Sequence, residues 1–77
     1  MKTHSDELAL YVAVVEAGSF RQAAENLGID NSVVSRGVKR LEAKLATVLL
    51  HRTTRRVTLT AEGEWFYERA ARILNEM

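Results

Sequence analysis

The 77-residue sequence predicts a mainly α-helical domain with one short β-hairpin before its last helix. Three observations predict this fold class. Apolar residues recur at the three- and four-residue spacing of a helix over most of the chain. After Leu45 this spacing changes, and β-prone residues flank a basic stretch. The chain contains no Pro and no Cys, so neither a Pro-rich nor a disulfide-stapled domain is expected.

The first two helices are marked by their end signals. A helix over residues 5–16 ends before Gly18, and its apolar stripe consists of Leu8, Tyr11, Val12 and Val15. Ser19 and Gln22 stand at the spacing of a capping box, in which each side chain satisfies a backbone N–H of the other residue. The second helix therefore follows Ser19 and ends at Gly28. Its stripe consists of Phe20, Ala23, Ala24 and Leu27.

The third helix begins after Asp30, a residue type suited to an N-cap, and runs to about Leu45. Its apolar stripe consists of Val34, Val38, Leu41 and Leu45. Two helices joined by a short turn with a glycine, and small residues that permit close approach, match a helix-turn-helix. The alternative is an ordinary helical hairpin in a bundle.

The face of the third helix opposite its apolar stripe decides between these alternatives. It contains no acid and carries Asn31, Ser32, Ser35, Arg36 and Lys39. An ordinary solvated face mixes both signs of charge, whereas amides, hydroxyls and cations suit base edges and phosphates. This face therefore favours DNA binding, and Glu42 lies off it.

A hairpin follows, with short β-prone runs at residues 50–52 and 57–59 and a basic tip at residues 53–56. A hairpin after a helix-turn-helix is the wing of a winged helix, and basic residues at its tip lie along the DNA backbone or in the minor groove. The alternative is an exposed loop whose arginines only confer solubility.

The last helix begins at Ala61, capped by Thr60, and continues to the end of the sequence. Its apolar stripe consists of Phe66, Ala70, Ile73, Leu74 and Met77. Little chain remains to cover the second half of this stripe. We therefore expect it to pair with another subunit in a homodimer.

The net charge of +1 hides an uneven distribution. Residues 31–56 carry seven basic side chains and one acidic side chain, for a net charge of +6, whereas residues 1–30 and 57–77 have net charges of −3 and −2. DNA affinity depends on the phosphates contacted locally and not on the whole-chain charge. The distribution places the contact surface on the third helix and the hairpin.

Other classes of protein receive little support. One small domain is too short for a two-domain enzyme, and the two histidines, His4 and His51, are far apart in sequence. No HExxH motif, phosphate-binding loop or metal-ligand cluster occurs, so we expect no catalysis, cofactor or metal. No signal peptide and no apolar run of roughly 18 residues is found, so a cytoplasmic chain without a membrane contact is expected.

The sequence is similar over almost its whole length to the DNA-binding domain of the LysR-type transcriptional regulators. The resemblance rests on the run Gly18-Ser19-Phe20-Arg21-Gln22-Ala23-Ala24-Glu25-Asn26-Leu27, on Val34-Ser35-Arg36, Leu41-Glu42 and Leu45, and on Arg52-Thr53-Thr54-Arg55 before Leu59-Thr60-Ala61-Glu62-Gly63. It implies a winged helix-turn-helix at residues 1–60 and a linker and dimerisation helix at residues 61–77. An effector-binding domain, absent from this chain, would normally follow.

The resemblance also implies functions for particular residues. The DNA-reading positions are Asn31, Ser32, Ser35, Arg36 and Lys39 on the third helix and Arg52, Arg55 and Arg56 at the wing. Homodimers or tetramers would act at promoters, and a small-molecule effector would bind only the absent domain. Three departures from the family pattern stand out: Asp30-Asn31 takes the place of the common Ser-Gln pair at the first reading position, Gly37 replaces a longer polar residue, and Ala46 replaces the usual glycine after the third helix. The main rival function is a winged helix that binds protein instead of DNA.

Overall fold

The structure, a computed structural model, describes residues 3–52 and 56–76. Within these ranges, helices and an antiparallel two-stranded sheet follow one another in the expected order. The elements are α1 (Thr3–Ala17), α2 (Phe20–Leu27), α3 (Asn31–Leu45), β1 (Leu50–Arg52), β2 (Val57–Leu59) and α4 (Ala61–Glu76). The predicted fold class is confirmed, and the helix ends agree with the predicted ones to within two residues.

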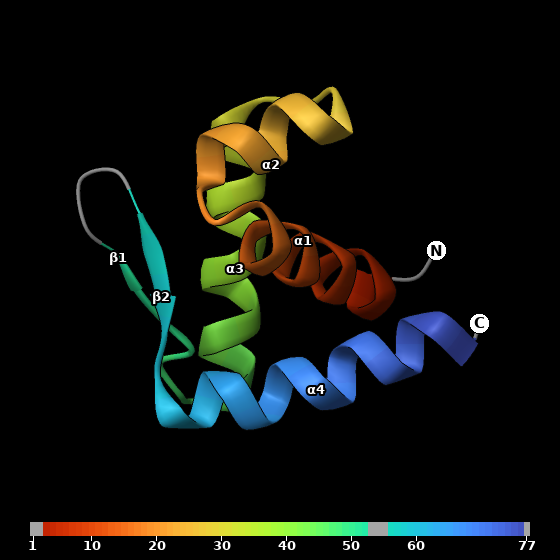
Figure 1. The fold of residues 1–77 in the computed structure, drawn as a ribbon, viewed down its shortest axis with the longest axis vertical. Coiled ribbons are helices and arrows are strands. Elements are labelled where there is room, and N and C mark those ends of the chain that lie inside the picture. Colours follow the sequence, from red (N-terminus) through yellow and green to blue (C-terminus); the bar gives the residue numbers. More distant parts are fainter. Residues whose placement is uncertain (1–2, 53–55, 77) are drawn as a thin grey trace.

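The helices surround one core, and α1 packs against each of the other three (Figure 1). In Figure 1, α2 lies over the N-terminal end of α3, and the hairpin stands beside α3. After the hairpin, α4 begins next to the C-terminal end of α3 and runs away from it. The largest fully buried side chains are Tyr11, Val14, Val34, Val38 and Leu49. Leu49, directly before β1, and Leu50 within β1 are both buried, so the start of the wing contributes to the same core as the helix-turn-helix.

Local signals set the ends of α2. The Ser19 hydroxyl accepts a hydrogen bond from the Gln22 backbone N–H at 3.0 Å, and Gly28 ends the helix with a φ of 71°. The reciprocal half of the predicted capping box is wrong, because the Gln22 amide donates instead to Asn26 at 2.9 Å. The side chain reaches one turn forward along the exposed helix surface.

The ends of α3 differ in part from those predicted. Asp30 occupies the N-cap position, but its side chain makes no capping hydrogen bond. At the other end Ala46 adopts a left-handed conformation with a φ of 52°, where an L-residue is strained by about 1–2 kcal/mol. The prediction that Leu45 belongs to the buried stripe is wrong. Its side chain is 40% exposed, because the chain reverses direction directly after it.

Two glycines allow backbone segments to approach closely. A Cβ at Gly37 would meet the side chain of Leu10, so the glycine lets α1 cross α3 at short distance. This contact explains the glycine inside a helix, where it costs about 0.5–1 kcal/mol relative to alanine. A Cβ at Gly63 would instead overlap the backbone carbonyl of Leu49. The first turn of α4 therefore lies directly against the chain that leads into the wing.

Hydrogen bonds fix this first turn of α4. The Thr60 hydroxyl accepts from Gly63 N–H at 2.9 Å, as expected of a cap, and donates to Val48 O at 2.8 Å. The Tyr11 hydroxyl donates to Gly63 O at 2.8 Å in the core. The ring of Tyr11 packs on Phe66 with centroids 5.6 Å apart. The start of α4 is thus built into the domain. Among the described residues, no helix combines the length and apolar character needed to cross a membrane.

Candidate nucleic-acid interface

The polar face of α3 is open to solvent. Four of the predicted reading residues are exposed, namely Asn31, Ser32, Arg36 and Lys39, and Ser35 is half-buried. Arg40 is also exposed and adds a cation that the sequence analysis did not single out. The buried residues Val34, Val38 and Leu41 hold the opposite face against the core. The helix therefore presents amides, hydroxyls and cations along one side.

Lys44 does not belong to this face, although it contributes to the positive charge of residues 31–56. Its ammonium lies 3.1 Å from the Oε1 atom of Glu7, a buried residue of α1. The contact is an ion pair without hydrogen-bond geometry, because neither carboxylate oxygen of Glu7 has a hydrogen-bond partner. Lys44 therefore joins the end of α3 to α1.

Glu42 is the acid around which the wing is attached to α3. Its Oε2 atom accepts from the backbone N–H groups of Leu49 at 2.9 Å and Leu50 at 3.2 Å. Its Oε1 atom lies 3.7 Å from a guanidinium nitrogen of Arg52. Sequence reasoning placed Glu42 off the reading face but missed this function. The available signal was its position as the one acid among seven bases in residues 31–56.

The Arg52 side chain makes several contacts within the chain, although the residue as a whole is exposed. Its Nη1 donates to the hydroxyl of Ser35 at 3.2 Å, and its Nη2 pairs with Glu42. The guanidinium carbon lies 4.5 Å from the ring centroid of Phe20 at the start of α2. Only 28% of the side chain is exposed. Arg52 therefore joins β1, α2 and α3.

The second strand of the wing is attached as well. The register pairs Leu50 with Leu59 and Arg52 with Val57, and Val57 N–H donates to Gly18 O at 3.1 Å. Of the predicted tip cations, Arg56 is exposed and Arg55 lies outside the described residues. The sides of the hairpin are thus connected to the turn before α2 and to α3.

The predicted dimerisation stripe on α4 is divided between core and surface. Ala70 is 1% exposed, and Phe66 and Leu74 pack against the core, because α1 covers this side of α4. In this arrangement Ala70 is buried within the chain. Ile73 is 47% exposed, and Met77 lies outside the described residues.

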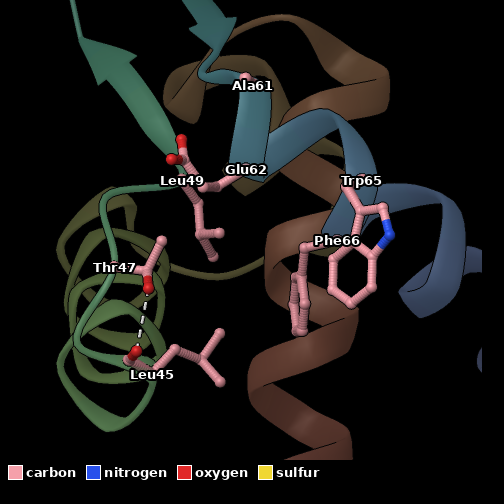
Figure 2. Close-up of a pocket in the computed structure, with 7 residues that line it drawn as sticks. All are labelled: Leu45, Thr47, Leu49, Ala61, Glu62, Trp65 and Phe66. Carbon is pink, nitrogen blue, oxygen red and sulfur yellow. Dashed lines mark hydrogen bonds between the residues drawn. The ribbon is translucent and has the colours of Figure 1, made fainter.

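A groove of about 410 Å³ lies between the end of α3 and the first turns of α4 (Figure 2). Figure 2 shows Leu45 and Thr47 on one side and Trp65 and Phe66 on the other. Trp65 is 59% exposed, and the guanidinium of Arg69 stacks on its ring at 4.2 Å. Trp65 is therefore a surface residue and not part of the core.

Two tyrosines have perturbed acidity. Burial, and secondarily the charges of Glu42 and Tyr67, raises the pKa of Tyr11 from 10.0 to about 12. The hydrogen bond that Tyr67 donates to Glu16 at 3.0 Å raises the pKa of Tyr67, with smaller contributions from burial and the charge of Glu16. Both phenols are therefore neutral donors at physiological pH, and both connect α1 and α4.

These features together define a winged helix-turn-helix protein, with an acid-free exposed helix and a hairpin fixed at its side. Residues 5–64 match the family model described as "Bacterial regulatory helix-turn-helix protein, lysR family". The chain therefore belongs to the LysR family of bacterial regulatory helix-turn-helix proteins.

Curated relatives are transcriptional regulators. The chain is 60% identical over 77 residues to the HTH-type transcriptional regulator CrgA of Neisseria meningitidis serogroup C (strain 8013), covering 100% of this chain and 26% of the relative. It is 46% identical over 72 residues to DmlR of Escherichia coli (strain K12), covering 94% of this chain and 24% of that protein. The chain thus spans about a quarter of the length of these relatives.

Solved structures share the fold closely. The complex of the BenM DNA-binding domain with benA site 1 DNA has a TM-score of 0.88 and 39% identity, covering 99% of this chain and 83% of that chain. The complex of the CbnR DNA-binding domain with DNA has a TM-score of 0.88 and 40% identity, covering 97% of this chain and 84% of that chain.

Proposed function

We propose that this chain is the DNA-binding part of a transcriptional regulator and that it binds double-stranded DNA of a specific sequence. The observation that carries the proposal is the exposed, acid-free polar face of α3. Related chains of the same fold were solved as complexes with DNA, which supports the same partner here. As a regulator of bacterial transcription the chain acts in the cytoplasm.

The residues of α3 divide by the chemistry that they offer to a duplex. The amide of Asn31 suits the paired donor and acceptor of adenine, and Arg36 and Lys39 suit guanine O6 and N7 or a phosphate. Ser32 and Ser35 hydrogen-bond to either kind of group. When DNA is bound, the wing cations Arg55 and Arg56 contact the sugar-phosphate backbone or enter the minor groove.

Two copies pair through α4 and place their recognition helices in successive major grooves, about 10 bp apart. Ile73 and Met77 are the members of the predicted stripe proposed for this contact, because Ala70 is used by the core. The first 60 residues act as the reading domain and residues 61–77 as the linker. An effector binds to a domain beyond these residues.

The DNA proposal is tested by selecting duplexes from a random pool and measuring affinity for selected and scrambled duplexes over a salt series. We expect tight binding to the selected duplex and a steep loss with salt. Arg36→Ala separates the two functions of that residue. Loss of a phosphate contact weakens both duplexes alike and reduces the salt slope by about 1, whereas loss of a base contact costs about 1–3 kcal/mol at one base pair.

Absence of salt-sensitive duplex binding by the wild-type chain would refute the proposal and favour a protein-binding winged helix. Pairing is tested by analytical ultracentrifugation. We expect Ile73→Glu to weaken self-association and Asn75→Glu, a matched change at a neighbouring exposed polar position, to have little effect. A wild-type chain that stays monomeric at high concentration, with and without DNA, would contradict pairing through α4.

A further inference from the structure

The guanidinium of Arg52 is held on three sides by groups of this chain. Glu42 lies beside one terminal nitrogen at 3.7 Å, the Ser35 hydroxyl lies at 3.2 Å from the other, and the Phe20 ring lies beneath the plane. The Glu42 carboxylate is itself held by two backbone N–H groups of the chain entering β1. A planar group with this many partners has one orientation.

The contact sets the hydrogen bonding of Ser35. A guanidinium has only donors, so the Ser35 oxygen must accept from Arg52 and keeps its own proton to donate elsewhere. The N–H of Arg52 polarises the hydroxyl and so strengthens it as a donor, and it occupies the lone pair that a second N–H group would approach. Ser35 stands at the edge of the polar face of α3, half-buried between that face and the wing.

We propose that Arg52 is a positioning residue that makes Ser35 a hydrogen-bond donor toward DNA, so that the chain selects an acceptor atom at one base pair. The acceptors of this class in the major groove are purine N7, guanine O6 and thymine O4, and the amino groups of adenine and cytosine are rejected. This inference rests on the proposed DNA binding and specifies part of its sequence selectivity.

The same geometry argues against Arg52 as a phosphate ligand. Its charge is balanced by Glu42, its plane is covered on one side by Phe20, and 28% of its side chain is exposed. A cation that already has an anionic partner displaces few counterions when DNA binds. Loss of the guanidinium fork is therefore expected to change base selectivity without changing the salt slope.

Arg52→Lys tests this function, because lysine keeps the charge but lacks the planar fork that reaches Ser35 and Glu42 together. Affinities are measured for duplexes selected by the wild-type chain and for every single base-pair change in them. We expect discrimination at one base pair to fall by about 5- to 150-fold while the salt slope stays as in the wild type. The matched control is Lys39→Gln, which removes an exposed positive charge from the same surface. This control is expected to reduce the salt slope by about 1.

Ser35→Ala is expected to lose discrimination at the same base pair, and the double variant is expected to lose no more than either single variant. Loss at different base pairs, or additive losses, would overturn the link between the two residues. Wild-type discrimination by Arg52→Lys, or a reduced salt slope with intact discrimination, would overturn the function of Arg52. If the wild-type chain binds no duplex, the proposed function fails first, which is a separate result.

A measurement on the unsubstituted chain covers the case in which Arg52→Lys does not fold. Nitrogen NMR of the arginine side chains, with Arg36 as the exposed comparison, reports rotation of each guanidinium. We expect the guanidinium of Arg52 to rotate slowly and its N–H groups to be protected from exchange. We expect neither property for Arg36. A guanidinium of Arg52 that rotates as fast as that of Arg36 would overturn the proposal without any variant.

Discussion

Gly63→Ala tests the close packing of α4 against the start of the wing. In an exposed helix this change stabilises a protein by about 1 kcal/mol, because alanine has the higher helix propensity. Here the new Cβ would overlap the backbone carbonyl of Leu49, which has no side-chain bond to rotate away. The sign of the effect is therefore expected to reverse.

The magnitude follows from what must move. Overpacking in a tight site costs about 1–3 kcal/mol. The displaced Leu49 carbonyl also accepts from Thr60 N–H at 3.1 Å, and this bond contributes about 0.5–1.5 kcal/mol. After the gain in helix propensity, we expect a net loss of about 2 kcal/mol. A small domain without disulfides or a metal has about 3–5 kcal/mol in total, so the variant is expected to remain folded in water but to unfold at a markedly lower urea concentration.

The assay is urea unfolding followed by circular dichroism, with Gly37→Ala as the matched control. At Gly37 the new Cβ would meet the Leu10 side chain, which can change rotamer. We therefore expect its effect to stay within about 1 kcal/mol. Equal stability of Gly63→Ala and the wild type, or equal losses in both variants, would refute the argument from backbone contact.

Three further predictions concern single residues. Because the folded-state pKa of Tyr11 is raised to about 12 from 10.0, the stability it provides is full below pH 10 and is lost between pH 10 and 12. Tyr11→Phe is expected to reduce this loss in urea unfolding measured across that pH range and to leave the part that comes from Tyr67, whose pKa is also raised. Ala46→Gly relieves a left-handed alanine and is expected to raise stability by about 0.5–1 kcal/mol, measured by thermal unfolding; a lower melting temperature would contradict it. Glu42→Gln is expected to cost about 2–3 kcal/mol in the same assay, since the hydrogen bonds from Leu49 and Leu50 are no longer charged and Arg52 loses its anion; an unchanged melting temperature would show that the wing is held by other contacts.

The order and ends of the helices were predictable because their determinants are local. Ser19, Gly28 and Thr60 act on backbone groups within a few residues, and the structure confirms each as a helix boundary. Helical periodicity also separates the polar face of α3 from its buried face without knowledge of the rest of the fold. These local signals persist in the folded structure because contacts with residues distant in sequence do not override them.

Features that depend on which elements meet were less predictable. The periodic stripe assigned Leu45 to the core and Ala70 to a partner, whereas chain reversal exposes Leu45 and α1 covers Ala70. The Gln22 side chain hydrogen-bonds to Asn26 and not, as the capping box predicts, to the backbone N–H of Ser19; both partners are close in sequence and polar. Periodicity identifies apolar faces, but the arrangement of α1 and α4 decides which face is buried within the chain.

The contacts of Arg52 were the feature least predictable from the sequence. Its partners Ser35 and Phe20 are 17 and 32 positions away, and a basic residue beside a basic tip is most simply interpreted as a phosphate contact. Only the position of Glu42 in an otherwise basic segment hinted at an internal pairing. Side chains that join elements distant in sequence require the fold itself to be known.

The attachment of the wing has a consequence for the duplex. Arg52 joins β1 to α3, and Val57 N–H joins β2 to the turn before α2, so the hairpin and the polar helix form one frame before any partner arrives. A hairpin and helix held at a fixed separation cannot change shape to match the grooves, so the duplex must deform when it binds. Bending a site costs from about 1 to 6 kcal/mol depending on the stiffness of its base steps. The width and flexibility of the grooves would then act as a second sequence filter, including at base pairs that no side chain touches.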